Sequence, residues 1–375
     1  MPVVYDRILH KEKQKLFKPV PYITAAIPAC VLIAVYFIFR SNTRFAEDVV
    51  NGFALPARRA AGYICSFVPF SVTELLFIAV AAAAIAFICR TVLIVVRSDA
   101  KLLSLLKRVL ILVIILLYYY ASFCFLWKFD YYSPTFAEKS GLSTTQFTTD
   151  ELIEVASYFA EHASLLASEM ERDENGNCDI DVPTVFTQYE HLYDGIQSEF
   201  SFLQGDVYRP KPMRLFSQVM SRTGFTGLYV SYTGESNINI NAPSFTIPCT
   251  ISHELAHQLG VYAEDEANFV GILACAQSDN DIYAYSGYFS GTIHLLNALY
   301  EVDRDAWDTI TSNFSDELRH DWNYNNSYWA DMESSVSEAA SEVYDEYLKS
   351  NGQDLGIASY SNCVILLVNY FMSVV

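Results

Sequence analysis

The sequence lacks the dense, regularly spaced cysteines of a small secreted fold held together by disulfides. Its eight cysteines are spread over 375 residues. Four lie in or near the apolar N-terminal third and are expected to pack as plain apolar side chains: Cys30, Cys65, Cys89 and Cys124. The other four could form disulfides in an oxidising compartment, and their spacing leaves the connectivity open: Cys178, Cys249, Cys275 and Cys363.

Basic residues are scarce in the second part of the chain. From Lys128 onward there are 10 Lys and Arg against 37 Asp and Glu, whereas the part before it has 14 against 6. A domain this acidic is not expected to bind nucleic acid through its phosphates. The contrast predicts two parts that lie in different environments.

Three apolar runs are long enough to cross a bilayer, which takes about 20 residues. Residues 20–39 and 109–127 contain no charged residue. Residues 72–96 contain two charged residues, Glu74 and Arg90. The first run is too long for a cleavable signal peptide, has no small-x-small cleavage site and precedes two further spans. The sequence therefore predicts a membrane domain over residues 1–128 and a second domain over residues 129–375.

The positions of the basic residues predict the orientation, because Lys and Arg are retained on the cytoplasmic side. Five precede the first span: Arg7, Lys11, Lys13, Lys15 and Lys18. Four lie between the second and third spans: Arg97, Lys101, Lys107 and Arg108. The opposite side has only the four between the first and second spans: Arg40, Arg44, Arg58 and Arg59. We expect a multi-pass protein of the cell membrane with a cytoplasmic N-terminus and an extracytoplasmic second domain.

The second domain is predicted to be an α+β unit with many helices and a small β-sheet. A helix begins at Thr149, and alternating residues from Gly227 to Ile240 predict a hairpin whose turn contains Glu235. Glu235 could approach the pocket, but we interpret it as a solvated turn carboxylate. Residues 363–375 are too short to span and are expected to pack in the core.

The motif His253-Glu254-Leu255-Ala256-His257 carries the clearest chemical signal. Two histidines four residues apart on a helix project from one face and can hold one metal ion. Glu254 is placed to act as a general base on a water activated by that metal. Zinc is the expected cofactor, since two imidazoles, one carboxylate and one open position form its usual catalytic set. Thr250 and Ser252 are expected to cap the helix start, and Gly260 to end the helix.

A third ligand is expected from the helix that begins at Glu264. Glu264 and Glu266 point to different sides of that helix, so only one of them should bind the metal. We choose Glu264, because Asn268 lies one turn further on the same face and could orient a ligating histidine. Glu266 remains the alternative.

Glu264-x-x-Ala267-Asn268 resembles the element that supplies the third zinc ligand in gluzincin-type metallopeptidases. The chain also resembles an uncharacterised bacterial family of unknown function with three N-terminal spans and a zincin-like outer domain. The matching segments are Val68–Ser71, Tyr232–Asn237, Pro248, His253–Gly260, Glu264–Phe269, Tyr285–Tyr288 and Tyr347–Gln353. The resemblance implies peptidase-like zinc chemistry and names no substrate. Only six residues separate His257 from Glu264 here, which is shorter than the usual gluzincin connection.

The expected function is that of a membrane-anchored zinc metallopeptidase that cleaves proteins or peptides at the outer face of the membrane. The strand before the motif helix could act as the edge on which a substrate peptide lies. Residue type leaves four candidates for the donor that stabilises the oxyanion: Tyr285, His294, Tyr347 and Tyr360. His294 and His320 are otherwise expected to be structural. The competing function is a non-catalytic receptor or scaffold that senses a ligand or metal and signals through the spans.

Overall fold

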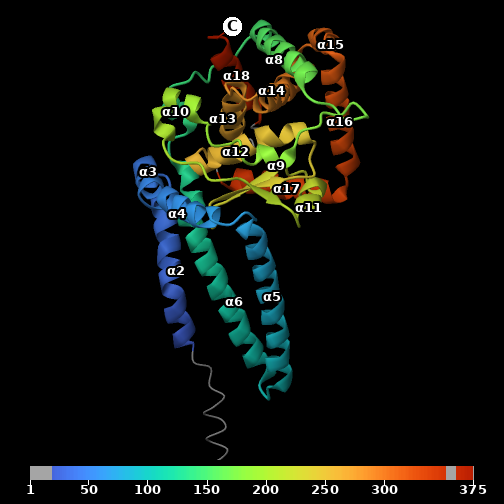
Figure 1. The fold of residues 1–375 in the computed structure, drawn as a ribbon. Helices are drawn as coiled ribbons and strands as arrows, with labels where there is room; N and C mark the ends of the chain where they lie inside the picture. Colours follow the sequence, from blue (N-terminus) through green and yellow to red (C-terminus); the bar gives the residue numbers. More distant parts are fainter. Residues whose placement is uncertain (1–18, 352–359, 375) are drawn as a thin grey trace, which may run out of the picture.

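The computed structural model describes residues 19–351 and 360–374 and places three long helices beneath a globular part (Figure 1). These helices are α2 (Val20–Phe39), α5 (Val72–Arg97) and α6 (Lys101–Phe123), which continues as the π-helical η2 (Cys124–Lys128). Each is long and apolar enough to cross a membrane, and few of their side chains are buried. The prediction of three apolar helices near the N-terminus is confirmed, and they indicate a membrane-associated protein.

The segment between α2 and α5 packs against the globular part. It contains α3 (Thr43–Val49), η1 (Val50–Ala54) and α4 (Leu55–Ser66). The buried Arg58 of α4 forms a two-pronged ion pair with the buried Asp130, with N–O distances of 2.7 and 2.8 Å, and stacks over the ring of Trp127. This contact ties α4 to the end of the third long helix.

The start of α5 is bound to the sheet by Glu235. Its carboxylate accepts hydrogen bonds from the backbone N–H groups of Val72 and Thr73 at 3.1 and 2.8 Å, and from the Thr73 hydroxyl at 2.9 Å. Only 2% of Glu235 is exposed, so its interpretation as a solvated turn carboxylate is wrong. Free N–H groups at a helix N-terminus attract a carboxylate, and this partner lies more than 160 residues away along the chain.

The sheet has three strands in the order β1-β3-β2. The predicted hairpin is present as antiparallel β2 (Gly227–Val230) and β3 (Glu235–Asn239), and β1 (Lys211–Met213) adds a parallel strand. The strand before the motif helix is therefore the central one. Our prediction that it offers an edge to a substrate is wrong, and the edge strands on its two sides are β1 and β2.

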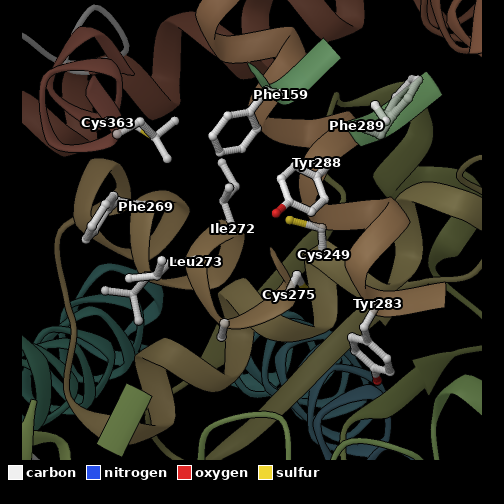
Figure 2. Packing of buried hydrophobic residues seen from close by; sticks show 14 of the residues in the cluster. Phe159, Cys249, Phe269, Ile272, Leu273, Cys275, Tyr283, Tyr288, Phe289 and Cys363 are labelled. Atoms are coloured by element: carbon white, nitrogen blue, oxygen red, sulfur yellow. The ribbon is translucent and has the colours of Figure 1, made fainter. Parts of the chain in front are cut away.

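Five helices form the core of the globular part: α8 (Thr149–Glu169), α12 (Ile247–Leu259), α13 (Glu264–Ala276), α14 (Asp281–Val302) and α18 (Tyr360–Phe371). Figure 2 shows Phe159, Ile272 and Tyr288 from α8, α13 and α14 packed together. The other elements are shorter or lie at the periphery: η3 (Asp130–Tyr132), α7 (Phe136–Ser140), α9 (Val182–Val185), α10 (Asp194–Glu199), η4 (Ser201–Leu203), α11 (Ser217–Arg222), η5 (Ser244–Thr246), α15 (Arg304–Ser312), α16 (Asp316–Met332) and α17 (Ser335–Ser350).

Two further expectations concern buried segments. The last apolar run packs in the core as expected, because Cys363, Leu367 and Val368 of α18 are buried. All eight cysteines lie within the described ranges and all are free thiols, so the structure contains none of the disulfides that their positions left open.

Replacing Glu235 tests the attachment of α5 to the sheet. Glu235→Ala should lower the stability of the full chain by about 1–3 kcal/mol, since it leaves buried N–H groups at the start of α5 without a partner. Thermal unfolding in detergent should show a lower midpoint. Glu301→Ala, at an exposed position near the end of α14, is the matched control and should leave the midpoint unchanged. Equal midpoints for both variants would contradict the assignment.

Candidate metal centre

The motif lies on α12, a helix that starts earlier than expected. It begins at Ile247 with Pro248 in its first turn, so Thr250 and Ser252 lie inside the helix, and the expectation that they cap its start is wrong. Proline at this position costs no hydrogen bond, because the first N–H groups of a helix have no partner within it. Gly260 ends the helix as expected, in a left-handed conformation with φ of 98°.

The short connection after Gly260 brings the start of α13 back to the two histidines. His253 Nε2 lies 3.3 Å from Glu264 Oε2, and His257 Nε2 lies 3.7 Å from Glu264 Oε1. One ligand atom from each of these three residues lies within 4.8 Å of the others. The six-residue connection is therefore long enough to place Glu264 beside both histidines.

Glu266 lies outside this cluster. Its carboxylate accepts hydrogen bonds from the backbone N–H groups of Phe136 and Ala137 at 2.8 and 2.9 Å, at the start of α7. Burial raises the pKa of Glu266 to about 7, although these two N–H groups oppose the rise. Its role is to fix the segment after α6 against α13, and Glu264 is the only one of the two glutamates that faces the histidines.

The backbone orients His257. Its Nδ1 lies 2.7 Å from the carbonyl oxygen of Val261, which can only accept, so Nδ1 carries the proton and Nε2 keeps its lone pair. Asn268, predicted to orient a histidine, lines the same cavity but makes no hydrogen bond to either ring within the described ranges. His253 Nδ1 is buried and has no hydrogen-bond partner among the residues described.

Glu254 is buried against the edge strand. Its Oε2 atom has no hydrogen-bond partner in the part of the chain that the structure describes, and only 4% of the residue is exposed. Gly227 of β2 leaves the room that this side chain occupies, because a Cβ atom at position 227 would lie 2.3 Å from Glu254 Oε1. A buried carboxylate oxygen without a partner is costly, so this group is set up for a ligand or reactant.

Burial and mutual charge shift all four ionisable groups of the site. Burial raises the pKa of Glu254 to about 8 and lowers that of His257 to about 4. Burial alone would lower the pKa of His253, but its hydrogen bond to Glu264 and the negative charge there raise it to about 9. The same contact outweighs the effect of burial on Glu264 and lowers its pKa to about 2. At neutral pH the protein alone thus holds one imidazolium and one carboxylate face to face.

The site opens into a cavity of about 1220 Å³. Two of the four candidate oxyanion donors, His294 and Tyr347, lie in its lining. Tyr285 is buried and donates to Asp321 at 2.5 Å, and the side chain of Tyr360 falls outside the described residues. His320 contacts Asn177 at 3.1 Å, which agrees with its expected structural role.

Sequence reasoning missed three residues around the site. Tyr344 of α17 lines the cavity and its hydroxyl interacts with Glu264. The rings of Trp127 and Tyr229 lie 6.0 and 6.1 Å from that of His257. Trp127 ends an apolar run, and nothing in the spacing of Trp127, Tyr229 or Tyr344 indicates that they approach the motif.

The residues present fit a divalent transition metal. Two imidazole nitrogens and a carboxylate converge, and the proton on Nδ1 of His257 leaves Nε2 free to act as a ligand. His253, His257 and Glu264 would hold the ion, and Glu254 would lie beside it without being a ligand. The hydrogen bond from His257 to a backbone carbonyl is the kind of contact that orients metal-bound histidines.

The comparisons with known proteins agree with the general organisation. A family described as a protein of unknown function (DUF3810) matches residues 50–368. The chain belongs to this family. No curated protein and no solved structure matches the chain significantly. The match of DUF3810 extends from η1 through two of the long helices to α18, so the family includes the metal-site residues together with α5 and α6.

Metal binding should depend on pH in a direction set by His253. A proton competes with the cation for Nε2, so the zinc affinity of the full chain should rise about tenfold per pH unit from pH 7 to about 9 and then level off. Competition against a chromogenic chelator measures this. His257→Ala should abolish binding, whereas His191→Ala, at a solvent-exposed histidine, should have no effect. An affinity that falls with rising pH over this range would contradict the charge assignment.

Proposed function

We propose that this protein is a membrane-anchored zinc metallopeptidase that hydrolyses peptide bonds at the outer face of the membrane. The observation that carries the proposal is the juxtaposition of His253, His257 and Glu264 with a buried, unpartnered carboxylate, Glu254, next to them. Three ligands with a nearby general base on a motif helix are what zinc-dependent hydrolysis requires.

Glu254 would carry the protons in this reaction. A zinc ion held by the three ligands supplies a Lewis acid that makes a water acidic and polarises a carbonyl group. In the protein alone, burial raises the pKa of Glu254 to about 8, and the positive charge of a bound cation would lower it again toward the range that a general base needs at neutral pH. Its carboxylate takes a proton from the attacking water and then delivers it to the leaving amine.

The edge strand β2 offers a place for the substrate backbone. Gly227, Leu228 and Val230 line the cavity, and β2 pairs with β3 on one side only. An extended peptide can add to such an edge through main-chain hydrogen bonds. His294 and Tyr347 lie in the same cavity, and burial lowers the pKa of His294 to about 4, so its neutral ring can donate a hydrogen bond to a developing oxyanion.

A non-catalytic receptor is the second candidate function. The ring contact between His257 and Trp127 favours it, because Trp127 belongs to the stretch that ends the third long helix. A change at the metal could therefore reach α6 directly. In this case the chain would bind zinc without hydrolysing peptides, and Glu254 would not matter for its activity.

Peptidase activity should depend on Glu254 and on the glycine that makes room for it. Full-length protein in detergent, incubated with casein and a peptide library, should cleave in the presence of zinc. Glu254→Gln should reduce the rate by at least about 100-fold with zinc content unchanged, since it removes the base. Gly227→Ala should also reduce the rate at full zinc occupancy, because the added Cβ atom displaces Glu254.

Glu301→Gln is the control for both variants and should retain the full rate. Zinc-dependent cleavage that survives in Glu254→Gln would contradict the mechanism. Zinc binding without any cleavage by the unsubstituted protein would favour the receptor.

We also propose a cytoplasmic N-terminus and an extracytoplasmic globular part. The basic residues near the N-terminus that supported this prediction lie outside the described residues. Among the others, four lie in or next to the α5–α6 connection and four in or next to the α2–α5 segment, so the proposal rests on the five basic residues that precede α2.

Cysteine labelling in intact cells tests the orientation. A membrane-impermeant maleimide should modify Ser143→Cys, which is exposed on the globular part, but not Asp99→Cys, which is exposed between α5 and α6. The unsubstituted chain measures the background from its own thiols. Labelling of Asp99→Cys alone would reverse the topology.

A further inference from the structure

The cavity that contains the metal centre continues along two of the membrane helices. Five residues of α5 line it: Leu76, Phe77, Val80, Ala81 and Ala84. They fall on one face of that helix, and Tyr119, Phe123 and Trp127 line it from α6 and η2. The same cavity therefore includes polar metal ligands at one end and an entirely apolar helix face at the other.

Because α5 is long and apolar enough to cross a membrane, the apolar end of the cavity is expected at the depth of the bilayer. Ala84 is twelve residues beyond the start of α5, which places it about 18 Å along the helix, whereas the hydrocarbon core is about 30 Å thick. The side chains of Phe77 and Val80 are exposed within the cavity or toward lipid. A water molecule in an apolar cavity finds no hydrogen-bond partners, so this end of the cavity is suited to apolar chains.

The fold holds this space open. At the far end, α5 and α6 meet, where Arg108 donates to the Thr91 hydroxyl and lies over the ring of Phe87. Figure 1 shows them apart beneath the globular part, where each is tied to a different element. Glu235 of the sheet binds the start of α5, and Asp130, just after α6, is paired with Arg58 of α4.

We propose that the substrate is a lipid-modified polypeptide whose acyl chain lies between α5 and α6 while its peptide backbone reaches the metal centre along β2. The cleavage of the peptide at the metal rests on the proposed function. The position of the acyl chain rests on the cavity alone. A substrate that occupies both ends of this one cavity has its cleaved bond close in sequence to its lipid anchor.

The length of the apolar end favours an acyl chain over a transmembrane helix. The lined part of α5, from Leu76 to Ala84, is only about 12 Å long, whereas a helix that crosses the bilayer spans about 30 Å. Beyond this part, α5 and α6 meet where Arg108 donates to Thr91, so a second helix could not continue between them. A flexible acyl chain can enter the space from the side of the globular part without passing that point.

Photocrosslinking tests the position of the acyl chain without requiring turnover. The full-length Glu254→Gln protein in nanodiscs of phosphatidylethanolamine and phosphatidylglycerol is mixed with a short peptide whose N-terminal palmitoyl chain carries a diazirine. Mass spectrometry then maps the labelled residues. Labelling should concentrate on the face of α5 that contains Leu76, Val80 and Ala84, and unlabelled palmitoyl peptide should compete for it whereas the acetylated peptide should not.

Tryptophan substitutions supply the matched control. Ala81→Trp and Ala84→Trp fill the apolar end and should reduce this labelling about tenfold, since they displace several methylene groups from the cavity. Ala82→Trp makes the same change on the opposite face of the same helix and should leave the labelling intact. Zinc content and unfolding midpoint should be equal in all three variants.

Three results would overturn the proposal. The first is labelling that is spread evenly around α5, as bulk lipid would give. The second is labelling that persists in Ala81→Trp and Ala84→Trp. The third is stronger labelling of the same face by a peptide with an apolar helical segment in place of the palmitoyl chain, which would assign the cavity to transmembrane segments instead.

With Glu254 present, the palmitoyl peptide should be cleaved faster than its acetylated counterpart. Labelling of the cavity without cleavage would reject the peptidase and leave the acyl site standing.

Discussion

Two carboxylates and two imidazoles share one buried space in this protein, and their charges must be balanced there. Glu264 faces both histidine rings, and the proton on His253 supplies the nearest positive charge. A divalent cation would replace that proton and satisfy three ligands together. The turn at Gly260, the start of α13 and the carbonyl of Val261 all serve to place these groups, so the architecture around α12 follows from this requirement.

Local spacing allowed much of the site to be predicted from the sequence. His253, Glu254 and His257 lie within one helix, and Glu264 begins the next helix after a short turn, so helical geometry alone brings them near one another. Contacts between distant segments could not be predicted in this way. Glu235 binds backbone groups of α5, and Gly227 faces Glu254 from another strand. The same limit explains why β1, which pairs only with β3, was not foreseen.

The attachments of α5 and α6 fix the candidate metal site relative to the long apolar helices. Trp127 lies at the end of the third long helix and contacts His257, while Glu235 holds the second long helix to the strand that precedes α12. Neither contact depends on a flexible segment, so the fold sets the distance between the apolar helices and the candidate metal site. A substrate anchored in the membrane would have to match that distance.

The pairing of Arg58 with Asp130 has a practical consequence for biochemical work. A soluble fragment starting at residue 129 would keep Asp130 and Glu235 but lose the guanidinium and the N–H groups that they bind. It would expose carboxylates and apolar surface that evolved to be covered, and the wall of the cavity that α5 and α6 provide would be gone. Assays and crystallisation therefore call for the intact polypeptide in a lipid or detergent environment.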